Sequence, residues 1–243
     1  MRIDVLTLFP KMFESPFEES IIKRAIKNNL VELKVHNLRD WAIDDYGSVD
    51  DKPFGGDVGM LIRADVVWKA LEEISKLNLS QALPLTHHFG GQAGQGLEKR
   101  RVIMMSARGR KFDQAKAEEL SKLENIVLIA GHYEGFDQRI SDYMVDEEIS
   151  IGDYVLTGGE LPAMVIIDSI TRLLPGVLGK DKSNQTESWS EIEVEGKKIR
   201  TIEYPQYTRP RDFMGKTVPE VLLSGDPKKI KDWQIEQIKK TIK

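Results

Sequence analysis

Short apolar runs alternate with longer amphipathic segments over the first 175 residues. The run Ile126–Ala130 is apolar at every position, which is typical of a strand in a parallel sheet covered on both faces. The pattern predicts strands at 3–9, 31–38, 101–107, 125–131 and 153–159, and helices at 17–28, 64–78, 113–123 and 160–174. This alternation predicts an α/β fold on a parallel sheet.

Two long segments interrupt the alternation. Residues 39–63 include DDKPFGGDVGM, and a loop of that length in a compact domain indicates a functional or a disordered segment. Residues 177–200 are polar and charged, as in a linker. Beyond them the pattern predicts a helix at 218–223 and another from about 228, whose apolar stripe is Ile230, Trp233, Ile235, Ile238 and Ile242. We therefore expect a domain at 1–178, a linker at 179–188 and a small basic helical domain at 189–243.

The predicted helix 160–174 is apolar on nearly every side, yet it carries Asp168 and Arg172. Pro162 fits the first turn of this helix and Pro175-Gly176 ends it. A helix that is apolar all round is expected to be buried, and buried charged groups need partners. Three interpretations remain open: the two residues pair with each other, line a subunit interface, or face a functional site.

Charge is unevenly distributed along the chain. The net charge is −4, but Lys197 to Lys243 contains twelve Lys or Arg and six Asp or Glu, hence +6, so the remainder carries −10. A basic tail on an acidic body is expected of a protein that binds a polyanion through its tail. A solvated helix face is the alternative explanation of the same charges. Aromatic residues within the tail favour nucleic acid: Tyr204, Tyr207, Phe213 and Trp233.

Composition excludes several chemistries and locations. There is no cysteine, hence no disulfide, thiolate nucleophile or cysteine-bound zinc. No apolar run is long enough to span a bilayer, so we expect no membrane association. The segment MRIDVLTLFP lacks the pattern of a signal peptide, and a cytoplasmic location is expected.

Common nucleotide-binding motifs are absent, whereas three glycine-bearing turns stand out. GGDVG and GGQAGQG lack dinucleotide spacing, and MGKT has Pro210 where a phosphate loop needs glycine. His132 is a candidate base or a structural histidine. The turns are SARG (106–109), AGHYEG (130–135) and SIGDYVLTGG (150–159). Ligands of open α/β sheets bind outside the carboxyl ends of the strands, so these turns predict a small-ligand site, with ordinary turns as the alternative.

Several long motifs in a fixed order resemble one known family. They are LFPKMFESPF, DDKPFGGDVGM, GRKFDQAKAEEL, AGHYEGFDQRI, the stretch 150–179 and YPQYTRP. The chain resembles, nearly end to end, the bacterial TrmD-type tRNA (guanine-N1)-methyltransferases of the SPOUT class. The resemblance implies an α/β fold with a deep trefoil knot, and a homodimer with the active site at the subunit interface. It also implies methyl transfer from S-adenosylmethionine to N1 of guanosine 37 in tRNA.

The resemblance also implies site residues. Cofactor contacts carried over by motif are Gly131, Ile151, Gly152, Asp153, Tyr154, Val155, Leu156, Gly158, Gly159, Pro162, Ser106 and Glu134. Arg172 matches a catalytic residue. Glu187 stands where the family has an aspartate general base, a departure that moves the carboxylate by about one bond. A displacement on the order of 1 Å can cost roughly 100-fold in rate.

Basic residues of the tail are the expected RNA contacts. We expect phosphates to bind Arg209, Arg211, Lys216 and the lysines of 228–243, which makes affinity fall as salt rises. The resemblance also raises Mg²⁺ as a requirement, although no cluster in the sequence marks a metal site.

Two alternative functions share most of these features. One is a knotted methyltransferase that acts on another RNA position, such as a ribose 2′-hydroxyl, which needs no linker carboxylate. The other is a non-catalytic RNA-binding protein of the same fold. The segment 86–100 is longer than the family requires, and its role is unexplained.

Overall fold

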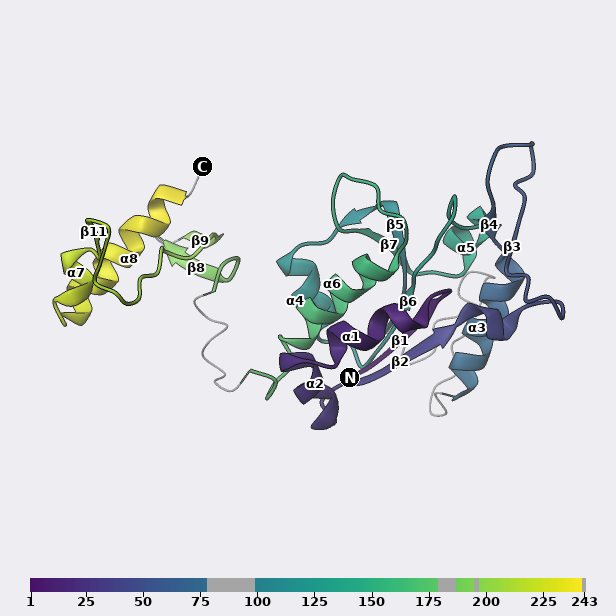
Figure 1. Cartoon of the computed structure of the whole chain (residues 1–243), viewed down its shortest axis with the longest axis horizontal. Coiled ribbons are helices and arrows are strands. Elements are labelled where there is room, and N and C mark those ends of the chain that lie inside the picture. Colours follow the sequence, from purple (N-terminus) through teal and green to yellow (C-terminus); the bar gives the residue numbers. More distant parts are fainter. Residues whose placement is uncertain (78–98, 179–186, 195–196, 242–243) are drawn as a thin grey trace. The chain divides into compact units, whose positions relative to one another are not determined.

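The computed structural model describes residues 1–77, 99–178, 187–194 and 197–241 (Figure 1). Two compact units divide the chain, Met1–Gly179 and Lys180–Lys243. The first unit contains a five-stranded sheet of order β2-β1-β6-β5-β7, in which every neighbouring pair is parallel. Its strands are β1 (Arg2–Thr7), β2 (Glu32–Asn37), β5 (Arg100–Lys111), β6 (Asn125–Ile129) and β7 (Glu147–Ser150).

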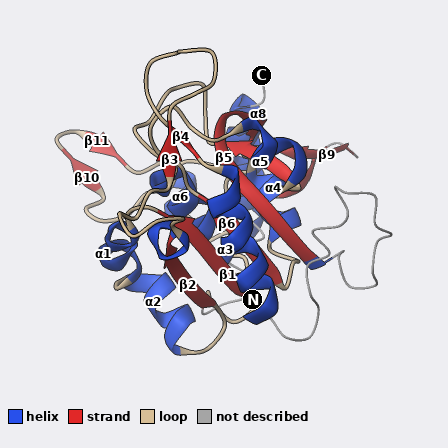
Figure 2. Cartoon of the chain, turned by 90° about the vertical axis from the view of Figure 1, so that its right-hand side faces the viewer, coloured by secondary structure: helices blue, strands red, loops and turns tan. Residues whose placement is uncertain are grey.

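Helices cover both faces of this sheet, as the apolar runs predict (Figures 1 and 2). One core packs against α1 (Glu14–Phe17), α2 (Ser20–Lys27), α4 (Gln114–Leu120) and α6 (Glu160–Thr171). The other packs against α3 (Ala64–Leu77) and α5 (Gln138–Tyr143). Figure 2 shows α3 in front of the strands. Smaller elements are the 3₁₀ helices η1 (Pro10–Phe13) and η2 (Leu38–Trp41) and the strands β3 (Asp50–Asp51) and β4 (Leu61–Ile62).

Strand β6 shows why its sequence is apolar throughout. Ile126 and Leu128 enter the first core, whereas Val127 and Ile129 enter the second. All four side chains are at most 4% exposed. Burying an aliphatic side chain contributes roughly 1.5–3 kcal/mol to stability. In a strand packed on both faces, the side chains of both faces contribute. The predicted parallel α/β architecture is confirmed.

Four of the five predicted strands are confirmed, and the one at 153–159 is wrong. The fifth strand of the sheet is β7, which lies earlier in the chain and buries Ile149. Residues 153–159 form a loop in which Tyr154 and Val155 are 55% and 88% exposed. Its apolar residues, which suggest a strand in the sequence, line a cavity instead of packing in the sheet.

The sequence predicts a buried helix, but within a single chain α6 is buried on only part of its surface. Ile166, Ile167 and Ile170 are fully buried, but Leu161 and Val165 are 51% and 43% exposed. Asp168 is exposed as well. Positions 161, 165 and 168 share one face of a helix. An apolar face of α6 therefore remains exposed within the described part of the chain.

The second unit mixes strands and helices, whereas a helical domain was expected. It contains two antiparallel hairpins, β8 (Glu191–Val194) with β9 (Lys197–Arg200) and β10 (Asp212–Phe213) with β11 (Lys216–Thr217). Helices α7 (Glu220–Leu223) and α8 (Pro227–Thr241) follow. The hairpin β8–β9 lies in the polar segment 177–200, just after the predicted linker 179–188, while residues 179–186 and 86–98 lie outside the described residues. No helix in the described ranges is long and apolar enough to cross a membrane.

A buried carboxylate ties β1 to β2. Asp4 is 1% exposed and accepts hydrogen bonds from Arg2 Nε at 2.8 Å and His36 Nε2 at 2.7 Å. Burial opposes ionisation of this carboxyl, but the bonds from His36 and Arg2 outweigh it and lower the pKa of Asp4 below its ordinary value. A lowered folded pKa means that the ionised form contributes stability above about pH 4, and that this contribution is lost as pH falls through the folded pKa.

Replacing Asp4 by Asn is expected to lower the free energy of unfolding by about 3 kcal/mol at pH 7, because the partly buried Arg2 guanidinium loses its anion and the bond from His36 loses a charged acceptor. The difference from wild type should shrink as the pH falls below about 4. Urea unfolding at several pH values measures both effects. Lys34→Gln is the control, since the Lys34–Glu32 pair on β2 is half exposed and should change stability by less than about 0.5 kcal/mol. A pH-independent loss in the Asn variant would contradict the assignment.

Candidate functional site

A cavity of about 520 Å³ lies where β5, β6 and β7 approach their carboxyl ends. Three turns form its walls: 106–108 within β5, 131–138 after β6, and 150–159 after β7. The structure thus brings together the three glycine-bearing turns singled out in the sequence. Every predicted cofactor contact except Asp153 lines this cavity.

The first wall is an interruption in β5. Met105 and Arg110 both pair with Ile149 of β7, so the residues between them leave the ladder. Ser106 and Arg108 reach the cavity from this bulge, and Ser106 Oγ accepts a hydrogen bond from the Arg108 amide at 3.2 Å. A Cβ on Gly109 would lie 2.5 Å from the backbone of Glu148, so glycine is needed where the strand rejoins the sheet.

The second wall joins β6 to the long segment 39–63. The Glu134 amide donates to the Met60 carbonyl at 3.1 Å, and the Ile62 amide donates to the Gly135 carbonyl at 2.9 Å. A Cβ on Gly59 would lie 2.3 Å from the Glu134 side chain. The long segment, predicted to be functional, is therefore anchored directly on a wall of the cavity.

The third wall is the loop between β7 and α6. The Gly159 amide donates to the Gly131 carbonyl at 2.8 Å, which joins this loop to the turn after β6. A Cβ on Gly131 would lie 2.3 Å from the Phe136 ring, and one on Gly159 2.8 Å from the Ala130 Cα. Asp153 belongs to this loop but does not line the cavity. Its carboxylate forms an ion pair with Lys111.

Sequence reasoning left the role of His132 open, and it missed Glu160. His132 Nε2 lies 2.7 Å from the carboxylate of Glu160, which is fully buried at the start of α6. Phe136, Asp137 and Gln138 were also missed as lining residues, although they belong to the motif AGHYEGFDQRI. Their place in that motif, directly after a glycine turn, was the available signal.

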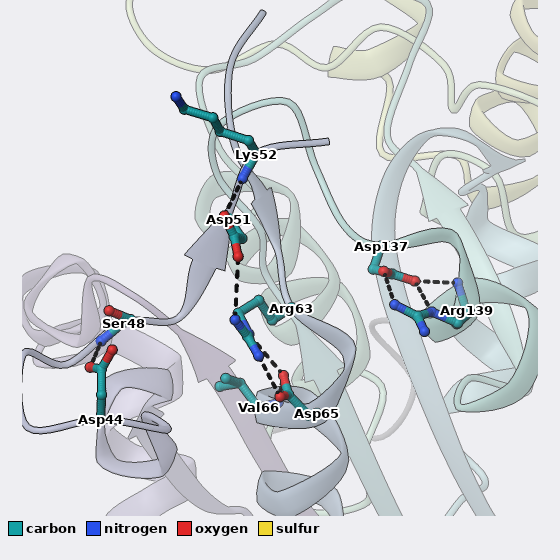
Figure 3. A network of polar contacts seen from close by, with 9 residues as sticks. All are labelled: Asp44, Ser48, Asp51, Lys52, Arg63, Asp65, Val66, Asp137 and Arg139. Atoms are coloured by element: carbon teal, nitrogen blue, oxygen red, sulfur yellow. Dashed lines mark hydrogen bonds and ion pairs between the residues drawn. The ribbon is translucent and has the colours of Figure 1, made fainter. Parts of the chain in front are cut away.

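A second cavity of about 560 Å³ adjoins the first, and Leu61 and Asp137 line both. Figure 3 shows the ion pairs on its wall: Arg63 lies 2.8 Å from Asp65 and 3.4 Å from Asp51, and Arg139 lies 2.7 Å from Asp137. The hydrogen bond from Arg63 lowers the pKa of Asp65, and that from Arg139 lowers the pKa of Asp137. These carboxylates are therefore ionised at neutral pH.

The two predicted catalytic residues do not line the cavity of their own chain. Arg172 is the C-cap of α6, is half-buried and makes polar contacts of its own. The helical rise of about 1.5 Å per residue puts it about 20 Å from Gly159 at the other end of α6. Glu187 belongs to the second unit, where its carbonyl accepts bonds from the Ser190 amide at 3.0 Å and the Ser190 hydroxyl at 2.6 Å.

Three predicted RNA contacts lie on or beside the hairpin β10–β11, and the predicted lysines between 228 and 240 lie on α8. Arg209, Arg211 and Lys216 are exposed, and Arg211 pairs with Glu220 at 2.9 Å. Phe213 and Met214, at the tip of the same hairpin, are 63% and 86% exposed. Within the described ranges, no group of three or more His, Asp or Glu side chains is placed to hold a metal ion.

The fold and this cavity define an α/β protein with a small-ligand site at one edge of a parallel sheet. The model of the family tRNA (Guanine-1)-methyltransferase TrmD matches residues 1–243. A tRNA (guanine-N(1)-)-methyltransferase of Dehalococcoides mccartyi strain BAV1 is 46% identical over 244 residues, covering 100% of this chain and 88% of the relative. One of Staphylococcus aureus strain JH9 is 46% identical over 237 residues, covering 98% and 85%. The chain belongs to the TrmD family.

Proposed function

We propose that this protein is an S-adenosylmethionine-dependent tRNA methyltransferase that modifies N1 of guanosine 37 and acts in the cytoplasm. The observation that carries the proposal is the family match over the entire chain. Its cavity supports the same function, because the lining residues coincide with the motif that the family uses for the methyl donor. We also propose that the first unit contains the deep trefoil knot of the SPOUT class.

The cavity fits a nucleoside-containing donor. A volume of about 520 Å³ lies within the roughly 300–1,000 Å³ typical of small-ligand pockets. Gly131, Gly152 and Gly158 line it, and without side chains their backbone groups can approach and hydrogen-bond a ligand. When bound, S-adenosylmethionine supplies an electrophilic methyl group on a positively charged sulfur. The loop 150–159 and the turn at Gly131 hold and orient that molecule.

Two side chains carry the chemistry on the RNA. N1 of guanine bears a proton that must leave as the new bond forms, and we assign its removal to the carboxylate of Glu187. General-base catalysis of this kind contributes about 10²–10⁴-fold. Negative charge then builds up at O6 of the base, and the guanidinium of Arg172 stabilises it. A comparable electrostatic contact is worth about 10²–10³-fold in rate.

The active site is completed by a second subunit in this proposal. Arg172 lies about 20 Å from the Gly159 end of its own helix, estimated from the helical rise. The exposed apolar face of α6, with Leu161 and Val165, fits a two-fold interface in which the helix packs against its own copy. A two-fold axis across the helix makes the pair antiparallel, so Arg172 of the partner subunit approaches the cavity. A homodimer thereby explains both the exposed face and the distant arginine.

The second unit binds the tRNA. The segment Lys197 to Lys243 has a net charge of +6, and Arg209, Arg211 and Lys216 lie beside exposed aromatic and apolar side chains. We assign residues 189–243 to RNA binding and 179–188 to the connection between the units. The target base must leave its stack to reach the methyl donor. Among the described residues no group of three or more His, Asp or Glu side chains is placed to hold Mg²⁺.

Incubation with S-adenosylmethionine and a tRNA transcript should yield 1-methylguanosine, detected by mass spectrometry of the digested nucleosides. A transcript with adenosine at position 37 should remain unmodified. Glu187→Gln should lower the single-turnover rate about 100-fold or more, because the amide cannot take the N1 proton. Glu187→Asp is the comparison variant: it keeps a carboxylate, although one bond shorter, and should lose less activity than Glu187→Gln. A methyl group on a ribose, or no transfer at all, would refute the proposal in favour of the alternatives.

Leu161→Glu combined with Val165→Glu should convert a dimer into monomers, because two desolvated carboxylates would face their copies across the axis. Sedimentation velocity measures the change, and methyl transfer should be lost with it. Tyr46→Glu is the control, because Tyr46 is 96% exposed and lies outside α6, so it should leave the oligomeric state unchanged. A wild-type protein that sediments as a monomer would remove the basis for a shared site.

Lys216→Ala should weaken tRNA binding and make it less dependent on salt. Losing one phosphate contact changes the slope of log affinity against log salt by about 0.7–0.9. Fluorescence anisotropy with labelled tRNA at several salt concentrations measures the slope. Lys34→Gln in the first unit is the control. An unaltered slope for Lys216→Ala would exclude a phosphate contact by this lysine.

A further inference from the structure

Glu160 is a fully buried carboxylate that the proposed mechanism does not use. It opens α6 beside the cavity and is 0% exposed. Thr7 Oγ1 donates to one carboxylate oxygen at 2.5 Å, and His132 Nε2 lies 2.7 Å from the other. One carboxylate therefore connects three segments: the end of β1, the turn after β6 and the start of α6.

Packing of the fold alone does not require a carboxylate at position 160. Burying an ionisable group is unfavourable unless it is fully hydrogen-bonded, and a leucine would fill a similar volume in an otherwise apolar helix. Both oxygens of Glu160 are bonded, so the cost is compensated. Both partners, Thr7 and His132, lie at the edge of the sheet where the cavity opens, Thr7 at the end of β1 and His132 shortly after β6.

The bonds of Glu160 act directly on two cavity walls. His132 lines the cavity, and its side chain is 19% exposed. A Cβ on Gly158 would lie 2.3 Å from His132 Nε2 and 2.5 Å from Glu160 Oε2. The imidazole and the carboxylate thus pack against the backbone of the third wall while belonging to the second wall and to α6.

The position of the imidazole is further restricted by Phe9. The rings of Phe9 and His132 meet edge to face, with centroids 4.5 Å apart. The Phe9 amide in turn donates to Thr7 Oγ1 at 2.9 Å. The Thr7 hydroxyl therefore orients the residue that packs on His132 and also bonds the carboxylate that holds His132.

We infer that Glu160 is a positioning residue for the methyl-donor pocket. Its carboxylate, bonded to Thr7 and His132, holds the turn at Gly131–His132 against the loop at Gly158–Gly159 and so sets the distance between two pocket walls before the ligand enters. The identity of the ligand rests on the proposed function. The inference concerns geometry, so it applies equally to the donor and to its demethylated product.

Glu160→Leu tests the inference because it keeps the volume and removes both bonds. We expect it to weaken S-adenosylmethionine and S-adenosylhomocysteine by about tenfold each, the effect of losing a buried hydrogen bond, with tRNA affinity unchanged. His132→Phe keeps the contact of rings with Phe9 and should produce a similar loss. Glu160→Gln should stay within about threefold of wild type, because an amide can bond both the hydroxyl and the imidazole. Titration calorimetry on the full chain gives the affinities.

Controls separate this role from general stability. Lys99→Gln breaks the exposed Lys99–Glu124 pair, neither member of which lines the cavity, and should leave both affinities within about twofold. Should Glu160→Leu fail to fold, Thr7→Val keeps the contact of Glu160 with His132 but removes both bonds of Thr7 Oγ1, to Glu160 and from the Phe9 amide, and should weaken both ligands by about threefold. Folding is monitored by thermal unfolding of each variant.

Three results would overturn the inference. Wild-type affinities in folded Glu160→Leu, or in Thr7→Val where that variant replaces it, would make the carboxylate purely structural. A loss confined to S-adenosylmethionine would make Glu160 a charge partner of the sulfonium. A Gln variant as weak as the Leu variant would exclude rescue by hydrogen bonding. A wild-type protein that binds neither ligand would instead refute the proposed function, which keeps the two failures distinct.

Discussion

The site depends on the parallel pairing of β6, β5 and β7. Met104 lies opposite Ile129, and Met105 lies opposite Ile149, so the three strands bring their following segments to the same edge of the sheet. The ladder hydrogen bonds fix this register, and two apolar cores hold it on both faces. Three turns that are distant in the sequence therefore meet at one edge of the sheet. Ligand chemistry can then reside in the turns, while the strands supply stability.

Close backbone contacts and one buried carboxylate further fix the positions of these turns relative to one another. The Gly159 amide donates to the Gly131 carbonyl, and a Cβ would meet the Phe136 ring at Gly131 and the Ala130 backbone at Gly159. Glu160 adds a second connection nearby, through partners on two other segments. Such a pocket is preorganised, because its walls are held by the protein and not by the ligand. The same rigidity suits a transfer reaction, in which alignment supplies much of the rate.

The residues that we propose for this site lie in different parts of a single chain. The cavity belongs to the first unit, Glu187 and the basic hairpin residues belong to the second, and Arg172 lies at the far end of α6. In the dimer that we propose, a second copy packed on the exposed apolar face of α6 covers that face and supplies the arginine. The proposed dimer would then serve both catalysis and burial. The proposed RNA contacts lie in the basic unit, so attraction of RNA would be confined to one part of the chain.

The sequence by itself determined the α/β class, four of the strands, most helices and the three glycine turns, because apolar periodicity and glycine report local backbone requirements. It misassigned 153–159 as a strand, since residues that line a cavity are as apolar as residues in a sheet. It also presented α6 as buried and 191–200 as irregular, because periodicity does not say what covers a face or which segments pair. Only the tertiary structure brought Thr7, His132 and Glu160 together. Their contacts span 28 and 153 positions, and such long-range packing leaves no periodic signal along the chain.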